Sequence, residues 1–333
     1  MCRSSWASRA TRASPSAVRI LAALLVLGIP ALCGAREYPP IASSVTPIKV
    51  TERVYYVQGE PGVASAANEG FNSNAGFVVT GAGVVVIDAL GTPALGAALR
   101  RAIARVTSEP VRRVILTHYH ADHFYGLEPL KAAGADVWAH KAARAYLEGG
   151  EAERRRAQRA QDLFPWVDEG MTLVAPDRWL DEHTEFSLGQ VRFEIHHLGP
   201  AHSPEDVIVV LPGEGVVFSG DILFAGRIPF VGEADSRQWL ERIARLVEMK
   251  PRIMITGHGE LSRDPGKDLA LTRDYLVYLR ATMGKAVEDF VPFEDAYAKT
   301  DWSRFEKVPA FAAANRVNAY GTYLLMEREL LAR

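Results

Sequence analysis

Short apolar runs bounded by Gly, Pro and polar residues recur along the first half of the chain. The runs that predict strands lie at residues 54–57, 77–79, 84–88, 111–116 and 137–139. Between the third and fourth runs, residues 95–106 place an apolar side chain every three or four positions, which is the spacing of one helical face. Further helices are predicted at 124–133 and at 142–163, where Gly149-Gly150 breaks the pattern.

The second half of the chain repeats this order of strands and helices. Its predicted strands lie at residues 191–195, 207–211, 216–218 and 252–256, and a helix is predicted at 236–249. The remaining C-terminal stretches, 264–290 and 309–331, have largely helical patterns. Two β-rich halves with helices between their strands predict an α/β protein, an αββα sandwich in which two sheets face each other and helices lie outside.

The N-terminus has the pattern of a secretory signal peptide. Four arginines precede the apolar run 20–32, and Cys33-Gly34-Ala35 offers small residues for cleavage after Ala35. The run is short and contains Gly28 and Pro30, which argues against a retained membrane anchor. We therefore expect a signal peptide at 1–35, an N-terminal arm at 36–49 and one domain at 50–333, located in the periplasm or secreted. Lipidation of Cys33 is the alternative that would hold the chain at a membrane.

Composition limits the chemistry and the partners of the exported chain. Cys2 and Cys33 are the two cysteines of the sequence and both belong to the predicted signal peptide, so neither a disulfide nor a thiolate ligand is expected. The formal net charge of −2 includes four arginines and no acids from that segment, so the remaining chain carries −6. An acidic chain without a long Lys/Arg run is a poor candidate for binding nucleic acid or an anionic membrane.

Residues 117–123 read Thr-His-Tyr-His-Ala-Asp-His and directly follow a predicted buried strand. Imidazole and carboxylate suit Zn²⁺ and, less selectively, other divalent first-row ions. Because side chains two apart on an extended segment point the same way, His118 and His120 can bind one ion. Asp122 and His123 lie in the turn towards the next helix and face another direction, which suggests two metals.

This segment resembles the His-x-His-x-Asp-His signature of the metallo-β-lactamase fold superfamily. Three further residues stand where that pattern expects ligands: His202 in Gly-Pro-Ala-His-Ser-Pro, Asp221 in Ser-Gly-Asp, and His258 between two glycines. The small neighbours allow the backbone to approach a crowded ion site closely.

The resemblance implies a dinuclear site with two divalent metal ions, Zn²⁺ foremost, with Fe or Mn as alternatives. It implies that one metal is held by His118, His120 and His202. It implies that the second is held by Asp122, His123 and His258, and that Asp221 bridges the two ions.

The same resemblance implies hydrolysis of a small-molecule substrate. A hydroxide shared by the two metals would attack an ester, thioester or lactam bond, and Asp122 would orient this nucleophile as well as bind metal. Hydrolysis of β-lactams as the main activity is one alternative. Another is a non-catalytic metal-binding accessory protein of a quinoprotein or redox system, with a periplasmic redox partner.

Two stretches narrow the resemblance within the superfamily. Residues 221–237 and the C-terminal stretch 318–329 look like the quinoprotein relay system zinc metallohydrolases, which also resemble SoxH-type proteins. Those proteins are exported, which agrees with the predicted signal peptide. Their substrates are poorly defined, so the resemblance does not name a reaction.

Other polar residues are interpreted as structural. Asp88 ends an apolar strand and is placed outside the site, and His140, His183, His196 and His197 are assigned no ligand role. The arginine run 154–156 is interpreted as a solvated helix face, with a clamp for a substrate carboxylate as the alternative. The Gly- and Asn-rich stretch 61–76 predicts a loop that is either a connector or a border of the site.

Overall fold

The computed structural model describes residues 37–232 and 234–332, and Glu37–Arg333 form one compact unit. The predicted signal peptide at 1–35, with Cys2 and Cys33, lies outside the described residues, so export and lipidation stay predictions. The limits predicted for the arm and the domain likewise stay predictions. Among the described residues, no helix combines the length and apolar character that crossing a membrane requires.

The first sheet has seven strands in the order β1 to β7. Its strands are β1 (Ile48–Lys49), β2 (Val54–Val57), β3 (Ala75–Val79), β4 (Val84–Ile87), β5 (Val111–Ile115), β6 (Asp136–His140) and β7 (Arg178–Leu180). β1 to β4 pair antiparallel, whereas β4 to β7 pair parallel. The parallel strands bring their carboxyl ends to one edge, which is where the motif after β5 lies.

The second sheet has five strands in the order β12-β11-β10-β9-β8. Its strands are β8 (His183–Leu188), β9 (Val191–His197), β10 (Val207–Leu211), β11 (Val216–Phe224) and β12 (Ile253–His258). β8 to β11 pair antiparallel, and β11 pairs parallel with β12.

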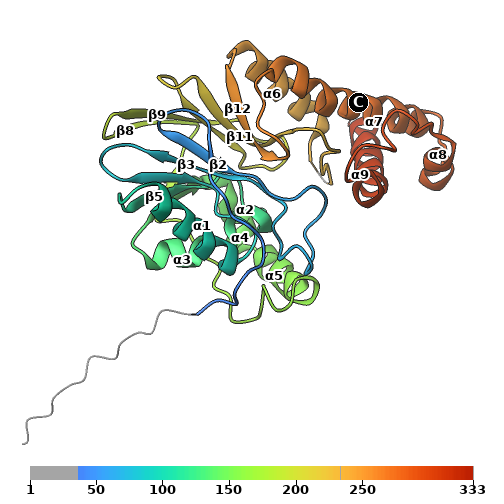
Figure 1. Cartoon of the computed structure of the whole chain (residues 1–333). Coiled ribbons are helices and arrows are strands. Elements are labelled where there is room, and N and C mark those ends of the chain that lie inside the picture. The colour runs from blue at the N-terminus through green and yellow to red at the C-terminus, as the bar shows by residue number, and fades with distance from the viewer. Residues whose placement is uncertain (1–36, 233, 333) are drawn as a thin grey trace, which may run out of the picture. The chain divides into compact units, whose positions relative to one another are not determined.

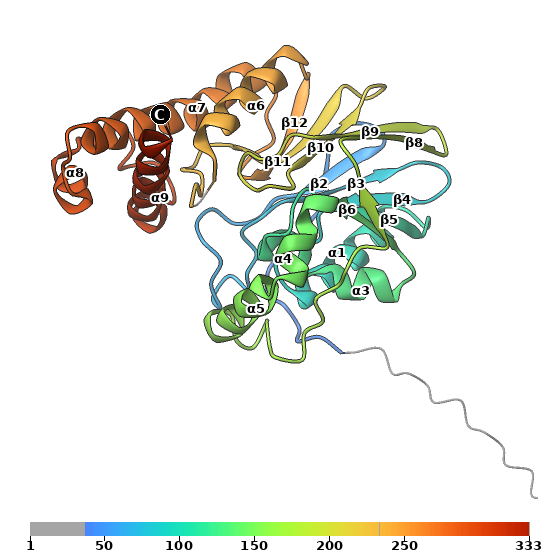
Figure 2. The ribbon, with the colours of Figure 1, turned by 180° about the vertical axis from the view of Figure 1, so that it is seen from behind.

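Helices fill the connections and form the C-terminal part of the chain. They are α1 (Pro93–Val106), α2 (Ala121–Phe124), α3 (Leu127–Ala132), α4 (Arg144–Glu148), α5 (Glu151–Asp162), α6 (Ser236–Glu248), α7 (Pro265–Glu288), α8 (Phe293–Lys299) and α9 (Phe311–Leu331), with a 3₁₀ turn η1 (Lys141–Ala143). Figures 1 and 2 show α1 and α3 beside the first sheet, and α6 and α7 beside the second.

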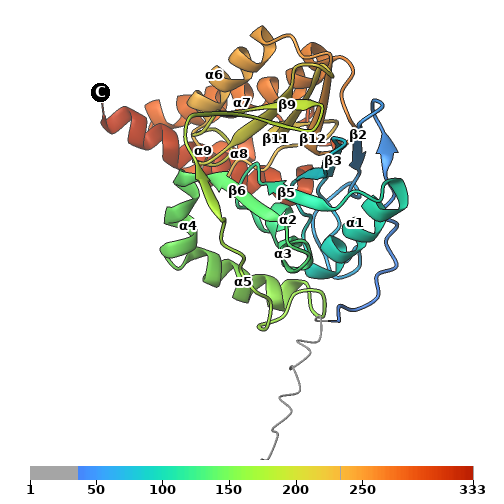
Figure 3. The same ribbon diagram turned by 90° about the vertical axis from the view of Figure 1, so that its left-hand side faces the viewer.

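The apolar side chains form layers that define the sandwich. One layer packs Leu99 of α1 against Val86 and Val114 on the outer face of the first sheet. A middle layer joins the inner faces of the two sheets, and includes Ile115 and Phe218. A third packs the second sheet against α6 and α7, and α9 packs in turn on α7. Successive side chains along a strand point to opposite faces, so each sheet has apolar side chains on both of its faces. The αββα sandwich predicted from the pattern is confirmed (Figure 3).

Several elements differ from the expectations. The first strand begins at Ile48 and pairs with β2, so strand pairing starts inside the expected arm. β11 runs through Ser219-Gly220-Asp221 to Phe224, because Gly220, with φ of +51°, lies at a register shift in the pairing with β12 and does not end the strand. The short helix α8 follows Pro292 in a stretch for which no helix was expected.

Candidate metal centre

The predicted ligands come from five segments that meet at one edge of the sandwich. His118 and His120 lie in the loop after β5, and His202 lies in the loop between β9 and β10. Asp122 and His123 belong to the short helix α2, where a turn was expected. Asp221 lies inside β11 and His258 is the last residue of β12.

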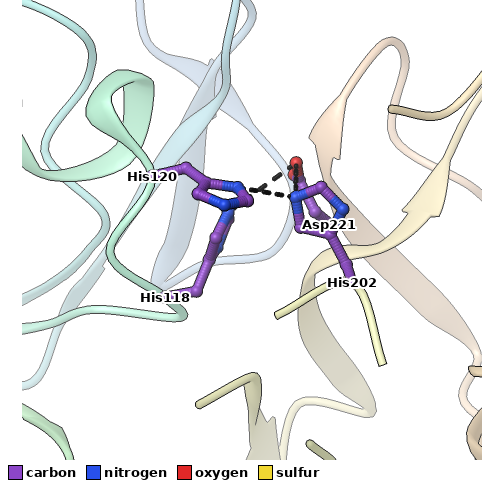
Figure 4. A group of neighbouring side chains, drawn as sticks. All are labelled: His118, His120, His202 and Asp221. Carbon is purple, nitrogen blue, oxygen red and sulfur yellow. Dashed lines mark hydrogen bonds and ion pairs between the residues drawn. The ribbon is translucent and has the colours of Figure 1, made fainter. Parts of the chain in front are cut away.

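These seven side chains form two adjacent groups able to hold metal ions. The first group is His118, His120, His202 and Asp221, and the second is Asp122, His123 and His258. Figure 4 shows the first group, with His118 and His120 projecting from one loop towards His202 and Asp221 on the other side. The structure therefore brings together every residue that the sequence predicted for the site.

Asp221 touches both groups. Its Oδ2 lies 3.3 Å from His202 Nε2, 3.4 Å from His258 Nε2 and 3.8 Å from His118 Nε2, and its Oδ1 lies 3.3 Å from His123 Nε2. Asp122 Oδ2 lies 3.3 Å from His258 Nε2. Two carboxylates thus face the Nε2 atoms of four histidines, which is a donor set for divalent first-row metals.

Several polar atoms of these two groups are buried without a hydrogen-bond partner. His118 Nε2, His123 Nε2 and Asp221 Oδ1 are buried and have no hydrogen-bond partner among the described residues. A buried polar atom without a partner is costly, so such a cluster needs an explanation. Metal ions held between the two groups would satisfy all three atoms, and the residues present therefore fit the ions.

The charge states of four of these side chains suit cation binding. Burial lowers the pKa of His118 well below its ordinary value and that of His202 to about 3, so both are neutral and keep a lone pair. Burial alone would raise the pKa of Asp221, but His258, His123 and His202 lower it well below the ordinary range. Burial also opposes ionisation of Asp122, but the hydrogen bond from His258 and the nearby His123 keep its pKa low.

The second ring nitrogen of most of these histidines is held by a specific partner. His123 Nδ1 lies 2.9 Å from Asp88 Oδ2, and His118 Nδ1 lies 3.0 Å from the Thr117 hydroxyl. His202 Nδ1 donates to the Phe230 carbonyl at 2.9 Å, and His258 Nδ1 donates to the Asn72 carbonyl at 2.7 Å. Because Nδ1 makes these bonds, Nε2 is the ring nitrogen that faces the cluster and would bind an ion.

Asp88 was predicted to lie outside the site, and in the structure it belongs to neither ligand group. Its carboxylate accepts from the Thr117 backbone N–H and hydroxyl, both at 2.8 Å, as well as contacting His123. Its backbone has φ of +60°, a conformation that Asp and Asn tolerate better than most residues. Asp88 therefore orients a histidine of the site from behind.

The stretch 61–76 is a loop as far as Asn74 and enters β3 at Ala75. The loop borders the site, which decides between the two interpretations of that stretch. Asn72 Nδ2 donates to Asp122 Oδ2 at 3.2 Å, and the Ser73 hydroxyl donates to the Asp122 carbonyl. Both residues were missed as members of the site. The sequence feature that pointed to Asn72 and Ser73 was a loop rich in Asn and Gly, and such a composition does not indicate what the loop contacts.

Arg227 is a buried cation beside the site that the sequence did not single out. Its side chain is 2% exposed, and its Nε and Nη2 have no hydrogen-bond partner among the described residues. Burial lowers its pKa, while Asp221 and Asp122 favour the charged form. Its Nη1 lies 3.3 Å from His258 Nδ1, which already donates to Asn72. Arg227 thus adds positive charge behind His258.

Small residues permit the close approach of the strands that carry the ligands. A Cβ on Gly257 would lie 1.9 Å from Asp221 Oδ1, and a Cβ on Gly220 would lie 2.7 Å from the Thr117 side chain. The Asp221 carboxylate therefore occupies the space that any larger residue at 257 would fill.

The remaining histidines, for which no ligand role was expected, lie outside these two groups. His140 stacks on His197 with ring centroids 3.6 Å apart, and His183 stacks on His196 at 4.5 Å. Each pair also has a glutamate nearby, Glu182 for the first and Glu194 for the second. Arg154 and Arg155 are exposed on α5, in agreement with a solvated helix face.

An αββα sandwich with adjacent His/Asp groups at one edge defines a metal-binding protein of the metallo-β-lactamase fold. The family model of the Metallo-beta-lactamase superfamily matches residues 68–258, more than half of the chain. The chain belongs to this superfamily.

Relatives in the superfamily include enzymes with different substrates. The chain is 26% identical over 195 residues to a "Metallo-beta-lactamase type 2" of Elizabethkingia meningoseptica, covering 57% of this chain and 70% of that protein. It is 26% identical over 179 residues to a "2,4-dinitroanisole O-demethylase subunit alpha" of Nocardioides sp. (strain JS1661), covering 53% of this chain. The match spans 49% of the demethylase subunit, about half of its length.

Solved structures share the fold. The sec-alkylsulfatase Pisa1 from Pseudomonas sp. superposes with a TM-score of 0.63 at 20% identity, covering 84% of this chain and 50% of the sulfatase. A metallo-beta-lactamase from Pontibacter korlensis superposes with a TM-score of 0.55 at 20% identity, covering 70% of this chain and 99% of that one. The chain is thus a metallo-beta-lactamase superfamily hydrolase with His/Asp groups suited to metal binding.

Proposed function

We propose that this protein is an exported dinuclear zinc hydrolase that cleaves an ester, thioester or lactam bond of a small molecule. The observation that carries the proposal is the position of Asp221, whose two oxygens face His202 and His123 of different ligand groups. A carboxylate placed in this way can bridge two ions, which a mononuclear site does not require.

The chain's own residues prepare the site for the ions and for the substrate. Asp88, Asn72 and Phe230 hold ring nitrogens of three histidines, so the opposite nitrogens point into the cluster. Divalent ions bound there would polarise a substrate carbonyl and lower the pKa of water towards neutrality. His120 is exposed to solvent and the Asp122 side chain is 17% exposed, so a substrate reaches the site from this side.

Asp122 is the proposed orienting residue for the attacking water. Its Oδ2 accepts from Asn72 Nδ2 and faces His258 Nε2, so the carboxylate is fixed in direction. Its low pKa keeps it ionised and able to accept a hydrogen bond from water at neutral pH. The Asp122 carboxylate would thus act both as a metal ligand and as the hydrogen-bond acceptor for the attacking water.

Export and the narrower family belong to the same proposal. The arginines and apolar run of residues 1–35 support a signal peptide and a periplasmic or secreted location. The patterns at 221–237 and 318–329 support a place among the quinoprotein relay system zinc metallohydrolases and SoxH-type proteins. The alternative is a non-catalytic accessory role in a redox system, and Asp122→Asn distinguishes it from catalysis. If the variant keeps its metal content, an accessory role should survive the substitution, whereas hydrolysis should not.

The test combines metal content with a hydrolysis panel on the purified exported chain. We expect about two zinc ions per chain by elemental analysis, and turnover of one class among a chromogenic cephalosporin, a thioester, an aryl ester, a lactone and an alkyl sulfate. Turnover should disappear on chelation, return with zinc, and be lost in His118→Ala.

His183→Ala is the matched control, because it removes a histidine from one of the other His/Glu groups and leaves the proposed centre intact. It should change neither the metal content nor the rate. One ion per chain in the wild type, or zinc lost in His183→Ala instead of His118→Ala, would refute the dinuclear assignment. Two ions with no turnover in the panel would contradict the proposed bond classes and favour the accessory role.

A further inference from the structure

The metal ligand His202 depends on a backbone carbonyl from a different part of the chain. Its Nδ1 donates to the Phe230 carbonyl at 2.9 Å. A carbonyl oxygen only accepts, so this bond fixes the proton on Nδ1 and leaves the Nε2 lone pair facing Asp221 and His120. The position of the Phe230 peptide therefore sets the direction of His202.

The Phe230 peptide lies in the segment that connects β11 to α6, and one side chain holds it on both sides. Asn318 of α9 donates from Nδ2 to the Pro229 carbonyl at 2.7 Å. Its Oδ1 accepts from the Val231 N–H at 2.8 Å and from the Gly232 N–H at 3.4 Å. Three backbone groups that flank Phe230 are thus bound by a single amide.

A chain of buried hydrogen bonds fixes the orientation of this amide. The second Nδ2 hydrogen of Asn318 points to the Tyr275 hydroxyl at 3.1 Å, and that hydroxyl donates to Asn315 Oδ1 at 2.8 Å. Asn315 Nδ2 then donates to the Tyr297 hydroxyl at 3.1 Å. Asn318 and Tyr275 are fully buried, so a flipped amide would leave several buried groups without partners.

A second observation places α9 directly against the same segment. Gly321 lies one turn after Asn318, and a Cβ at that position would stand 1.9 Å from the Gly232 carbonyl oxygen. Only a glycine allows the helix to come so close. Helix and segment are therefore packed through backbone contact as well as through the amide.

We propose that Asn318 is a positioning residue for the metal centre, acting on His202 through the Phe230 carbonyl. The C-terminal helices α7 and α9 then serve the site as well as the fold, because they hold the acceptor that orients one of its ligands. This inference rests on the proposed function, since it requires that His202 binds metal.

The test compares two asparagines of the same buried network. Asn318→Leu keeps the side-chain volume and removes the three bonds to the segment, whereas Asn315→Leu breaks the network and leaves those bonds in place. We expect both variants to unfold at lower temperature. Only Asn318→Leu should weaken the binding of zinc at one of the two sites, by about 10- to 100-fold in competition with a chromophoric chelator. It should also alter the electronic spectrum of the cobalt-loaded protein.

Equal zinc affinities and cobalt spectra for the two leucine variants would show that Asn318 is structural only, which overturns the inference. If Asn318→Leu does not fold, Gly321→Ala replaces it, since the added Cβ displaces the Gly232 carbonyl without removing a hydrogen bond. Retention of wild-type zinc affinity in Gly321→Ala would likewise overturn the inference. Failure of the wild type to bind zinc at His202 would instead refute the proposed function, so the two failures are distinguishable.

Discussion

Asp221 and His123 meet in the middle of the site, with Oδ1 of the carboxylate 3.3 Å from Nε2 of the imidazole. Neither atom has a hydrogen-bond partner among the described residues. Burial alone would lower the pKa of His123, but Asp221 and Asp88 raise it well above its ordinary value. Without an ion the imidazole therefore favours its protonated form, so binding of a metal at Nε2 would be coupled to release of a proton.

The first prediction concerns Asp221, which we propose bridges the two ions. Asp221→Asn keeps the volume and removes the charge that both ligand groups share. Metal binding should therefore weaken at both candidate sites, by more than the about 10- to 100-fold that loss of a ligand's supporting partner costs. Metal content after gel filtration and chelator competition measure the change. Asp235→Asn is the matched control, because Asp235 caps α6 and asparagine caps equally well. Loss of a single ion with full affinity at the other site would contradict a bridging role.

The second prediction concerns the carboxylate behind His123. Asp88→Asn preserves the backbone conformation with positive φ. The amide has only one acceptor oxygen, so it cannot replace the carboxylate in its bonds to the Thr117 N–H, the Thr117 hydroxyl and His123 Nδ1 at once. We expect zinc affinity to fall about 10- to 100-fold at the site that contains His123. Competition titration measures it, and cobalt spectra show which of the two sites is affected. Unchanged affinity would mean that Asp88 supports only the loop.

The third prediction concerns the glycine that faces Asp221. Gly257→Ala places a Cβ 1.9 Å from the present position of Asp221 Oδ1, so the carboxylate must move. Zinc affinity should fall by at least about tenfold, comparable to the loss of an orienting partner. Gly213→Ala is the control, because an added Cβ there meets no atom within 4 Å. A Gly257→Ala protein with wild-type zinc affinity would show that the carboxylate has room to shift without losing the ions.

The fourth prediction concerns pH and a histidine outside the centre. Burial, followed by the stacked His197, lowers the pKa of His140 from 6.5 to about 4. Because the folded pKa is below the unfolded one, this stabilising contribution is complete above pH 6.5 and is lost as the pH falls towards 4. The loss should be about 1 kcal/mol at pH 5 after allowance for solvent screening.

His140→Asn tests this contribution in the metal-free protein. In the wild type, His140 Nδ1 accepts from the Ala142 N–H at 3.3 Å. An asparagine side chain can accept the same bond and does not titrate. Denaturant unfolding at pH 7.5 and pH 5 should therefore show a smaller pH dependence in the variant. An equal dependence in both proteins would assign the acid sensitivity to other groups.

The sequence by itself determined the fold class and the identity of the candidate ligands. Strand and helix periodicities predicted two sheets with helices outside, because the repeat of apolar positions is a local property of the chain. The first four candidate ligands were recognised because His118, His120, Asp122 and His123 occur together in one short stretch. His202, Asp221 and His258 were found only through the resemblance to a family, since each stands alone in its own loop or strand.

Tertiary structure decided which residues support the ligands, because those contacts join segments far apart in the chain. Asn72 reaches Asp122 and His258, and Asn318 reaches the peptide that orients His202. An asparagine in a loop or a helix has no sequence pattern that distinguishes it from a surface residue. The same holds for Gly220, which reads as a strand end but lies within β11, because the pairing with β12 continues the strand past it.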